Sequence, residues 1–368
     1  MKQIGFIIIF FGFFGVLIGA NIYLPYRMGW YFNIERTWVL YMLSVLITFY
    51  MIAGLFANSN ALSSIGSLIY RTAAITLGMM LYLLISVLMV DLLRIFTNWS
   101  PQLYGLITVS LTVLISLYGI WNSTNLKTSQ IEIPIRGLKT GIRAVHLSDI
   151  HIGHFRGKAF LQKIVDRTNK LKPDVVFLTG DLFDGRIRLD EESIDPLRQI
   201  EVPVFFVEGN HDLYTGVQKI KSMLRKNGIK VLENEVVNWN DLQIVGLNHM
   251  AADHNTVSMH ASNDGPTIKK VMDNLPIEVG DPSILLHHSP DGIEYASKSG
   301  IDLYLSGHTH AGQLFPINYI SGLVFPYNRG LHSYNGTRIF VSEGAGTFGP
   351  PMRIATKSEI TIVNLMPN

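Results

Sequence analysis

Cysteine is absent from the 368 residues of this sequence, which excludes disulfide bonds, thiolate nucleophiles and cysteine-based zinc sites. Charge is scarce as well, because Asp, Glu, Lys and Arg together make up 16% of the chain, against roughly a quarter in an average soluble protein. The formal net charge is +2, and Lys and Arg form no dense run. A nucleic acid is therefore not indicated as a partner.

Histidine and the few charges are unevenly distributed. The first 126 residues contain five basic residues, two acidic residues and no histidine, whereas all twelve histidines lie from His146 onward. A length of 368 residues is comfortable for two domains. Imidazole rings concentrated in one part of a chain indicate a metal site or an acid–base site in that part.

Long apolar runs fill the first third of the chain. Each has about the 20 residues that a helix needs to cross the hydrocarbon core of a bilayer, and Tyr and Trp gather near the ends, as rings at the headgroup level do. A cleaved signal peptide could account for the first run, but that run is longer than a usual signal sequence and three more follow. We therefore expect a four-helix transmembrane domain over residues 1–126, with helices near residues 4–26, 37–57, 72–90 and 101–121.

The middle of each run lacks ionisable side chains. Transport paths usually contain one, because an intramembrane charge is costly and tends to be kept for function. An anchor, or a surface that presents lipid, is therefore the better interpretation of the helices. Four crossings put both ends of the domain on the same side of the membrane, and the distribution of Lys and Arg favours the cytoplasmic side.

Residues 141–368 have a different pattern, in which short β-branched runs alternate with helix-like stretches such as residues 158–172 and 216–226. This alternation predicts an α/β fold built on βαβ units, with the functional site beyond the carboxyl ends of the strands. Residues 127–140, which include Ser, Thr and Pro, are the expected linker between the domains. The expected strands are residues 142–147, 175–178, 202–207, 242–247, 284–286, 303–305, 339–341 and 360–363.

Five short segments place Asp, Asn or His directly after strand-like runs. A lone histidine after a strand is more often a hydrogen-bonded loop residue than a ligand, and an Asp-Gly-type turn is usually only a turn. Carboxylate, amide and imidazole together, however, are the ligands that Mn, Fe, Zn and sometimes Mg take in proteins. The segments are Ser148-Asp149-Ile150-His151, Gly180-Asp181-Leu182-Phe183-Asp184, Gly209-Asn210-His211-Asp212, His287-His288-Ser289-Pro290 and Gly307-His308-Thr309-His310.

In this order the segments resemble the calcineurin-like metallophosphoesterase superfamily, whose pattern is D-x-H, G-D-x-x-D, G-N-H-D/E, a strand ending in His, and G-H-x-H. All five blocks are intact, and the resemblance covers roughly Gly141 to the C-terminus. The tail from Ser342 to Arg353 resembles a bacterial branch with membrane-bound and exported members. With four helices in front, the layout is similar to that of transmembrane proteins with a metallophosphoesterase domain. The resemblance implies an α/β sandwich of two central mixed β-sheets flanked by helices.

The resemblance also implies two divalent metal ions, which would be Mn, Fe, Zn or Mg. Carried over to the matching positions, one ion is expected on Asp149, His151, Asp181 and His310, and the other on Asp181, Asn210, His288 and His308, so that Asp181 bridges the two. His288 matches the family's spacing to the following proline, but His287 beside it could be a bystander or could compete for the metal. Asp184 is expected to be structural rather than a ligand.

Two cations about 3.5–4 Å apart would lower the pKa of a bridging water, whose hydroxide attacks phosphorus, and would neutralise the phosphoryl oxygens. The resemblance assigns a catalytic role to His211, which polarises the phosphate or protonates the leaving group, with Asp212 available to orient its ring. A protein nucleophile is not needed, in agreement with the absence of cysteine and of a G-x-S-x-G elbow. The residues that bind the substrate are not indicated.

The remaining histidines carry weaker signals. His249, His254 and His260 lie in a polar stretch that is expected to be a solvated loop, with a substrate-contacting lid as the alternative. His146 lies inside a strand-like run and is expected to be a hydrogen-bonded core residue. His154 and His332 have no assignment.

These features predict a membrane-anchored, metal-dependent phosphodiesterase or pyrophosphatase, located in a bacterial inner membrane with the catalytic domain on the cytoplasmic side. Family membership does not fix the substrate, but a tether at the bilayer raises the effective concentration of the enzyme toward lipid-borne substrates. We therefore expect the lipid bilayer as a partner and a lipid-linked phosphoester as the substrate, similar to UDP-diacylglucosamine or a phospholipid. A water-soluble ester such as a nucleotide, with the helices only an anchor, is the alternative. A non-catalytic receptor or scaffold is a further one.

Overall fold

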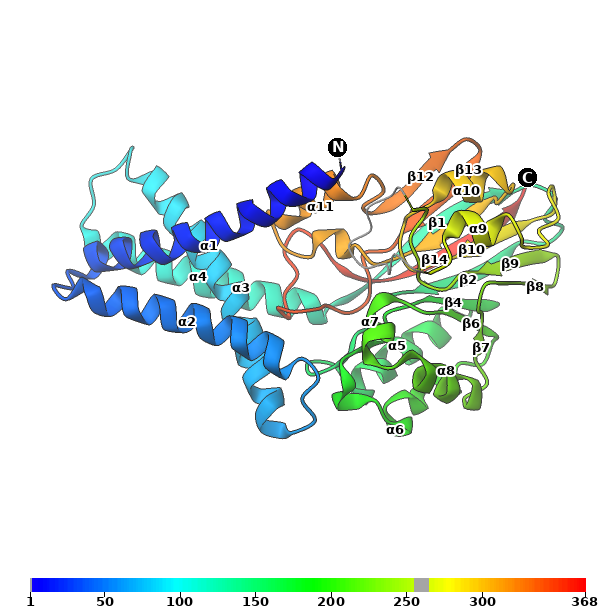
Figure 1. Cartoon of the computed structure of the whole chain (residues 1–368), viewed down its shortest axis with the longest axis horizontal. Coiled ribbons are helices and arrows are strands. Elements are labelled where there is room, and N and C mark those ends of the chain that lie inside the picture. The colour runs from blue at the N-terminus through cyan, green and yellow to red at the C-terminus, as the bar shows by residue number, and fades with distance from the viewer. Residues whose placement is uncertain (1, 255–264) are drawn as a thin grey trace. The chain divides into compact units, whose positions relative to one another are not determined.

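The computed structural model describes residues 2–254 and 265–368, and the chain divides into two compact units (Figure 1). The first unit runs to Trp121 and includes Gly349–Met352, and the second comprises Asn122–Phe348 and Arg353–Asn368. Each unit is described by itself.

The first unit is built from four helices, α1 (Lys2–Phe32), α2 (Thr37–Asn58), α3 (Ser64–Leu93) and α4 (Pro101–Thr124). Among the described residues, α2, α3 and α4 are long and apolar enough to cross a membrane. The helix expected over residues 4–26 lies inside α1, which is not one of these three. Three candidate spans are therefore confirmed, and the fourth stays a prediction.

A buried ion pair joins α1 to α3 inside the first unit. The guanidinium of Arg27, which is 5% exposed, donates to the carboxylate of Asp91, and the hydroxyl of Tyr23 donates to the same carboxylate. Arg94 reaches Asp91 over 3.0 Å. The side chain of Trp30 lies beneath both guanidinium groups, 4.7 Å from Arg27 and 4.3 Å from Arg94. Pairing of this kind satisfies charges that an apolar helix bundle cannot otherwise hold.

The second unit contains two six-stranded mixed sheets, as the α/β sandwich requires. In spatial order, the first sheet consists of β1 (Leu126–Ile135), β14 (Ser358–Pro367), β2 (Ile142–Leu147), β4 (Val175–Thr179), β6 (Val204–Val207) and β7 (Lys230–Val231). The second consists of β12 (Gly330–Tyr334), β13 (Thr337–Val341), β11 (Leu303–Ser306), β10 (Ser283–Leu286), β9 (Leu242–Gly246) and β8 (Glu235–Trp239). The short strands β3 (Ile152–Gly153) and β5 (Phe183–Asp184) pair with each other.

The linker expected over residues 127–140 is wrong for most of its length. Residues 126–135 form β1, which pairs in parallel with β14 along its whole length. Ile133 and Ile135 are fully buried and Ile131 packs against the same core, because alternate side chains of a strand point to one face. Only one residue, Asn125, separates α4 from β1, so the connection between the apolar helices and the sheet is very short.

Three apolar layers hold the second unit together. Phe177 and Phe205 of the first sheet meet Ile284 and Leu305 of the second in the central layer. On the outer face of the first sheet lie α5 (Lys158–Lys170) and α8 (Val217–Lys226), and on the outer face of the second lie α9 (Ile268–Met272) and α10 (Ile293–Lys298) (Figure 1). The amphipathic stretches 158–172 and 216–226 are thus confirmed as helices that cover a sheet.

Parallel neighbours bring several strand ends to one edge of each sheet. β2, β4 and β6 run parallel in the first sheet, and β9, β10 and β11 run parallel in the second. The five ligand-bearing segments follow the carboxyl ends of β2, β4, β6, β10 and β11. The chemistry is therefore expected at this edge of the sandwich.

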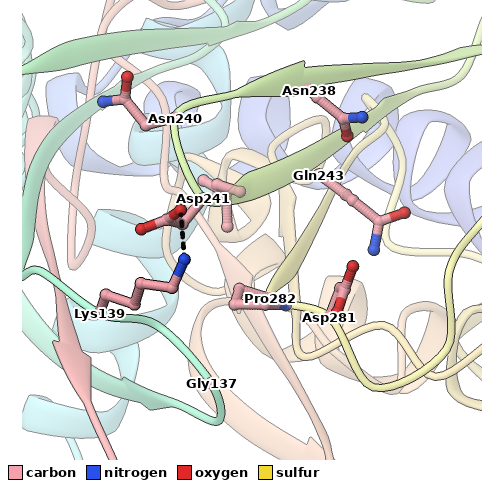
Figure 2. A pocket seen from close by; sticks show the side chains of 9 residues that line it. Gly137, Lys139, Asn238, Asn240, Asp241, Gln243, Asp281 and Pro282 are labelled. Carbon is pink, nitrogen blue, oxygen red and sulfur yellow. Dashed lines mark hydrogen bonds and ion pairs between the residues drawn. The ribbon is translucent and has the colours of Figure 1, made fainter.

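A polar hollow lies at the opposite ends of the strands (Figure 2). It is lined by the beginning of β9, by Pro282 just before β10, and by Gly137 and Lys139 ahead of β2. Lys139 pairs with Asp241 at 3.2 Å, and both side chains are exposed, so the pair contributes little to stability. The hollow brings together none of the predicted ligands, and it is not the functional site.

Candidate metal centre

Unusual backbone geometry positions the predicted ligands. Asp149, His151, Asp181, His308 and His310 all have positive φ, between 48° and 73°. Such conformations are strained for residues other than glycine and cluster at functional sites. They let residues two apart, such as Asp149 and His151, turn their side chains to the same region, as the sequence predicts.

Glycine is required ahead of the ligands because the backbone there passes close to another ligand-bearing turn. A Cβ on Gly209 would lie 2.1 Å from Oδ1 of Asp181, and a Cβ on Gly307 would lie 2.1 Å from Oδ2 of Asp149. The backbone of one ligand-bearing turn therefore passes directly beside the carboxylate of another. Only glycine fits at these two crossings.

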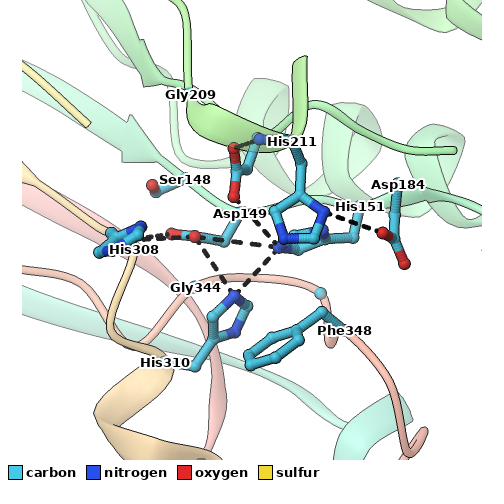
Figure 3. A network of polar contacts seen from close by, with 12 residues as sticks. Ser148, Asp149, His151, Asp184, Gly209, His211, His308, His310, Gly344 and Phe348 are labelled. Carbon is cyan, nitrogen blue, oxygen red and sulfur yellow. Dashed lines mark hydrogen bonds and ion pairs between the residues drawn. The ribbon is translucent and has the colours of Figure 1, made fainter. Parts of the chain in front are cut away.

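A first group of donor atoms comprises Asp149, His151 and His310, all buried (Figure 3). Nε2 of His151 lies 3.0 Å from Nε2 of His310, and Nε2 of His310 lies 3.3 Å from Oδ1 of Asp149. Two ring nitrogens and a carboxylate oxygen thus face one another. These three residues match the ligands expected for one ion.

A second group comprises Asp149, Asp181 and His288. Nε2 of His288 lies 3.2 Å from Oδ2 of Asp181, and Nδ1 of His308 lies 3.2 Å from the same Nε2. Oδ2 of Asp181 is also 3.7 Å from Nε2 of His151, so this oxygen lies between the two groups. The position is the one expected of a bridging carboxylate, although Asp149 also reaches His288 at 4.0 Å.

The donor atoms fit divalent cations. Oδ1 of Asn210 is buried and has no hydrogen-bond partner among the described residues, which leaves it available as a ligand. Nδ1 of His288 donates to the carbonyl oxygen of Thr179 at 2.8 Å, so the lone pair of neutral His288 lies on Nε2, which faces the carboxylates. Carboxylate, amide and imidazole donors without thiolate suit metals of intermediate hardness.

Electrostatics favour ionised carboxylates in this buried place. Burial alone would raise the pKa of Asp149 and Asp181, but facing imidazoles, His310 for Asp149 and His288 for Asp181, hold both pKa values below their usual range. Burial lowers the pKa of His288, but Asp181 outweighs that effect and raises it to about 9. The ionised carboxylates therefore favour the binding of a cation.

His211 lies beside the first group, with its ring 4.8 Å from that of His151. Its Nδ1 is 3.0 Å from Oδ1 of Asp184 (Figure 3). Its backbone N–H donates to Oδ1 of Asp181 at 2.8 Å. Burial lowers the pKa of His211, but Asp181 and the hydrogen bond to Asp184 raise it to about 9. Both carboxylates therefore favour the protonated form of the ring.

The expectation that Asp212 orients the ring of His211 needs correction. The carboxylate of Asp212 accepts hydrogen bonds from the backbone N–H groups of Gly209 at 3.0 Å, Leu182 at 3.0 Å and Phe183 at 3.1 Å. It thereby ties the turn after β6 to the turn after β4. Asp184 takes the orienting place instead, because it lies beside the ring at the end of β5.

Two residues of the C-terminal tail line the site and were not assigned from the sequence. Arg353 is fully buried, and its Nη2 donates to Nδ1 of His310 at 3.0 Å and to the carbonyl oxygen of Gly346 at 2.8 Å. The ring of Phe348 packs 5.0 Å from that of His310. The tail motif was noticed in the sequence, but only the fold shows that it reaches a metal ligand.

The other histidines divide into three kinds. His146 is buried with Nε2 2.8 Å from Oγ1 of Thr179, as expected of a core residue, and His154 is also buried. His254 is exposed, whereas His332 is half-buried, with Nε2 2.8 Å from the carbonyl oxygen of Arg329. His260 lies outside the described residues. Nδ1 of His287 lies 2.8 Å from the hydroxyl of Tyr304. None of the three candidate donor groups of the described residues, the third of which is His151, Asp184 and His211, includes His287.

The assignment of His249 to a solvated loop is wrong. Its side chain is only 9% exposed, and its ring lies 5.8 Å from that of His288 and 6.0 Å from that of His308. The sequence held a signal for this place, because His249 follows a strand-like run just as the expected ligands do. The polar residues after it masked that signal.

Comparison with known proteins agrees with this geometry. Residues 142–312 match the family model of the calcineurin-like phosphoesterases. The zebrafish (Danio rerio) transmembrane protein with metallophosphoesterase domain is 35% identical over 69% of this chain and 61% of its own length, so the alignment spans less than two thirds of that relative. An uncharacterized metallophosphoesterase of Campylobacter jejuni is 32% identical over 69% of this chain and 68% of its own. Another, of Aquifex aeolicus, is 31% identical over 69% of this chain and 97% of its own. With the donor groups at the strand ends where this family has its metal ligands, the chain belongs to the calcineurin-like metallophosphoesterases.

Proposed function

We propose that this protein is a membrane-anchored phosphoesterase that uses two divalent metal ions to hydrolyse a lipid-linked phosphodiester or pyrophosphate. The observation that carries the proposal is the two buried donor groups, which share Asp149, with Oδ2 of Asp181 within reach of both and the ring of His211 beside them. Mn, Fe, Zn or Mg, when bound to these groups, would supply positive charge to the phosphoryl oxygens and a water of lowered pKa.

His211 is the residue best placed to move a proton. Its hydrogen bond to Asp184 occupies Nδ1, which leaves the proton on Nε2 for the oxygen of the leaving group. Its backbone N–H, bonded to Asp181, fixes the ring at the edge of the donor groups. General acid catalysis of this kind contributes roughly 10²- to 10⁴-fold to a rate.

Phe348 and Asp149 shape the surroundings of the reacting group. The ring of Phe348 packs 5.0 Å from that of His310 and 6.0 Å from that of His211, forming an apolar wall beside the ligands. Both carboxylate oxygens of Asp149 accept from the backbone N–H of His308 at 3.1 Å, which fixes one ligand turn against the other. The ligands are thus oriented before any substrate arrives.

An apolar surface beside the ligands supports a lipid-linked substrate. Helix α11 (Ile317–Val324) follows the turn of His308 and His310, and just after the helix Phe325 packs its ring 5.5 Å from that of His308. The helix exposes Tyr319 by 68% and Leu323 by 85%. Phe315, Ile317 and Ile320 extend this α11 surface. An exposed apolar strip next to charged ligands suits a molecule with acyl chains attached to a phosphate.

The apolar helices support attachment to a bilayer. Three of them have the length and composition of membrane spans, and the fourth, α1, is proposed as a further span. A single residue separates α4 from β1, so no long linker lies between the last candidate span and the catalytic unit, which is proposed to act at the membrane surface. We further propose that this surface is the cytoplasmic side of a bacterial inner membrane.

The function is tested by Mn²⁺-dependent hydrolysis with the detergent-solubilised full chain. The measurement compares kcat/KM for UDP-diacylglucosamine with kcat/KM for a soluble aryl phosphodiester. The proposal expects the lipid to be preferred by at least 100-fold. Equal values would favour a water-soluble substrate, and an inactive protein that still binds metal would favour a receptor or scaffold.

A further inference from the structure

His249 stands at the end of one of three adjacent parallel strands. β9, β10 and β11 pair in register, with Gly246 opposite Leu286 and Leu286 opposite Leu305. His249 lies three residues beyond β9, while His288 and His308 each lie two residues beyond β10 and β11. The three histidines therefore lie on the same side of the site, each after the end of its strand.

The ring of His249 faces both of the other two. Its centroid is 5.8 Å from that of His288, at an angle of 67°, and 6.0 Å from that of His308, at an angle of 40°. The rings of His288 and His308 themselves are 5.0 Å apart. On its other side His249 stacks on His287, with centroids 5.9 Å apart and planes only 7° from parallel. Its ring thus has one stacked face and lies within 6.0 Å, centroid to centroid, of two expected metal ligands.

Neither ring nitrogen of His249 is satisfied. Nδ1 and Nε2 are both buried and have no hydrogen-bond partner in the part of the chain that the structure describes. By contrast, one ring nitrogen of His288 is bonded to Thr179, and one of His287 to Tyr304. A buried polar atom without a partner lowers the stability of the fold by about 1–3 kcal/mol. We therefore expect a ligand to bind these ring nitrogens.

The unpartnered ring nitrogens of His249 indicate that a cation is the missing ligand. Because neither ring nitrogen has a partner among the described residues, a neutral His249 ring offers a free lone pair. Oδ1 of Asn210, an expected ligand of the same ion, is also buried and has no partner among the described residues. An amide oxygen and an imidazole lone pair can bind either a hydrogen-bond donor or a metal ion.

We propose that His249 is an additional ligand of the divalent ion expected on His288 and His308. That ion then has three imidazoles, one from each of three neighbouring strand ends. The inference rests on the proposed two-metal function and adds a residue outside the five segments to it. Because imidazole suits Zn and Fe better than Mg, this position is expected to prefer the nitrogen-seeking metals.

The absence of cysteine from the chain gives a direct test of coordination. A thiolate bound to Co²⁺ produces an intense near-ultraviolet charge-transfer band, which the natural sequence cannot produce. The full chain in detergent is stripped of metal and titrated with Co²⁺ as wild type, as His249→Cys and as His332→Cys. His332 is the control because it lies in β12 and belongs to none of the candidate donor groups of the described residues. The band is expected in the His249→Cys variant alone.

Calorimetric titration of the metal-free protein with Zn²⁺ gives the second measurement. His249→Gln is expected to weaken one of two binding equivalents by at least 10- to 100-fold, the loss found even for residues that only support a metal ligand. The affinity of the other Zn²⁺ equivalent is expected to be unchanged. The variant His332→Gln is expected to bind Zn²⁺ with the affinity of the wild type. Unchanged Zn²⁺ affinity in His249→Gln, or no band from a His249→Cys variant that binds two Co²⁺, overturns the assignment.

These experiments use no substrate, so their outcome is separate from that of the proposed function. A wild-type protein that binds two ions and hydrolyses a phosphoester while His249→Gln binds them equally well would refute only the role of His249. A wild-type protein that binds no divalent ion would refute the two-metal function itself.

Discussion

Oδ1 of Asp184 lies 3.0 Å from Nδ1 of His211, at the open edge of the donor groups. Asp184 is the last residue of β5, and His211 belongs to α7 (Asn210–Thr215), which follows β6. The pair therefore links two of the ligand-bearing turns. It also supplies the negative charge that keeps His211 protonated against the effect of burial.

Asp184→Asn is expected to shift the pH dependence of hydrolysis. Burial lowers the pKa of His211 while Asp181 and Asp184 raise it to about 9, so a proton-donating His211 is active below that pH and loses its proton above it. Without the charge of Asp184, the pKa falls and the alkaline limb of kcat/KM moves to lower pH. We expect kcat to drop by about 10- to 100-fold, within the range of general acid catalysis.

The matched control for this prediction is Asp166→Asn. Asp166 is an exposed carboxylate on α5, where it accepts a hydrogen bond from Gln162. Its removal is expected to leave the pH profile unchanged. An alkaline limb that stays in place in Asp184→Asn would show that His211 is not the titrating acid.

Asp212→Ala is expected to lower the stability of the fold rather than to act directly on the catalysed reaction. The substitution leaves three buried backbone N–H groups, those of Gly209, Leu182 and Phe183, without their acceptor. Hydrogen bonds to a charged group contribute roughly 1.5–3 kcal/mol each, but a single loss of this kind rarely exceeds about 4–5 kcal/mol in total. Thermal unfolding of the metal-free protein should show a fall of about 10 °C. An unchanged unfolding temperature would contradict the structural role.

The ligand-bearing segments could be predicted because strand-like runs and the residues after them are adjacent in sequence. Asp149, Asp181 and His308 needed no knowledge of the fold beyond the convergence of parallel strand ends. The partner of His211 could not be chosen in this way. Asp184 and Asp212 are both near it in the motif, and only the direction of the turns after β4 and β6 decides between them.

Two other differences between the prediction from sequence and the structure have local physical causes. The strand β1 was mistaken for a linker because Lys127, Thr128, Ser129 and Gln130 hide the alternation of Ile131, Ile133 and Ile135 that follows. His249 was placed in a solvated loop because the residues after it are polar. Its burial depends on stacking against His287 and on the neighbouring strand ends, which are distant in sequence.

Removal of metal is expected to abolish hydrolysis, and Asp181→Asn is expected to do the same without unfolding the chain. Oδ2 of Asp181 lies 3.2 Å from Nε2 of His288 and 3.7 Å from Nε2 of His151, so its charge serves both donor groups. We expect kcat/KM to fall by more than about 10³-fold, as befits a group needed for charge stabilisation in the transition state. Chelation followed by Mn²⁺ should restore the wild type alone. Normal turnover by Asp181→Asn would refute the bridging assignment.

Asp91→Asn is expected to destabilise the helical unit. It leaves the guanidinium of Arg27, only 5% exposed, without its carboxylate partner. Breaking one side of a buried ion pair costs about 3–5 kcal/mol. Four of the five tryptophans, Trp30, Trp38, Trp99 and Trp121, lie in this unit, so thermal unfolding followed by tryptophan fluorescence reports on it. Glu35→Gln, a change at an exposed position, is the control and should unfold at the wild-type temperature.

Leu323→Gln combined with Tyr319→Gln is expected to separate lipid hydrolysis from hydrolysis of a soluble ester. Both side chains are largely exposed on α11, so their replacement removes apolar surface without opening a cavity in the core. If the α11 surface holds acyl chains, kcat/KM for UDP-diacylglucosamine should fall by about 10-fold or more, since burying one such side chain contributes about 1.5–3 kcal/mol. The value for an aryl phosphodiester should not change, because the ligands and His211 are untouched. Val279→Gln, which alters an equally exposed apolar residue ahead of β10, should leave both substrates unaffected. A parallel loss on both substrates would mean that α11 supports the metal site rather than the lipid.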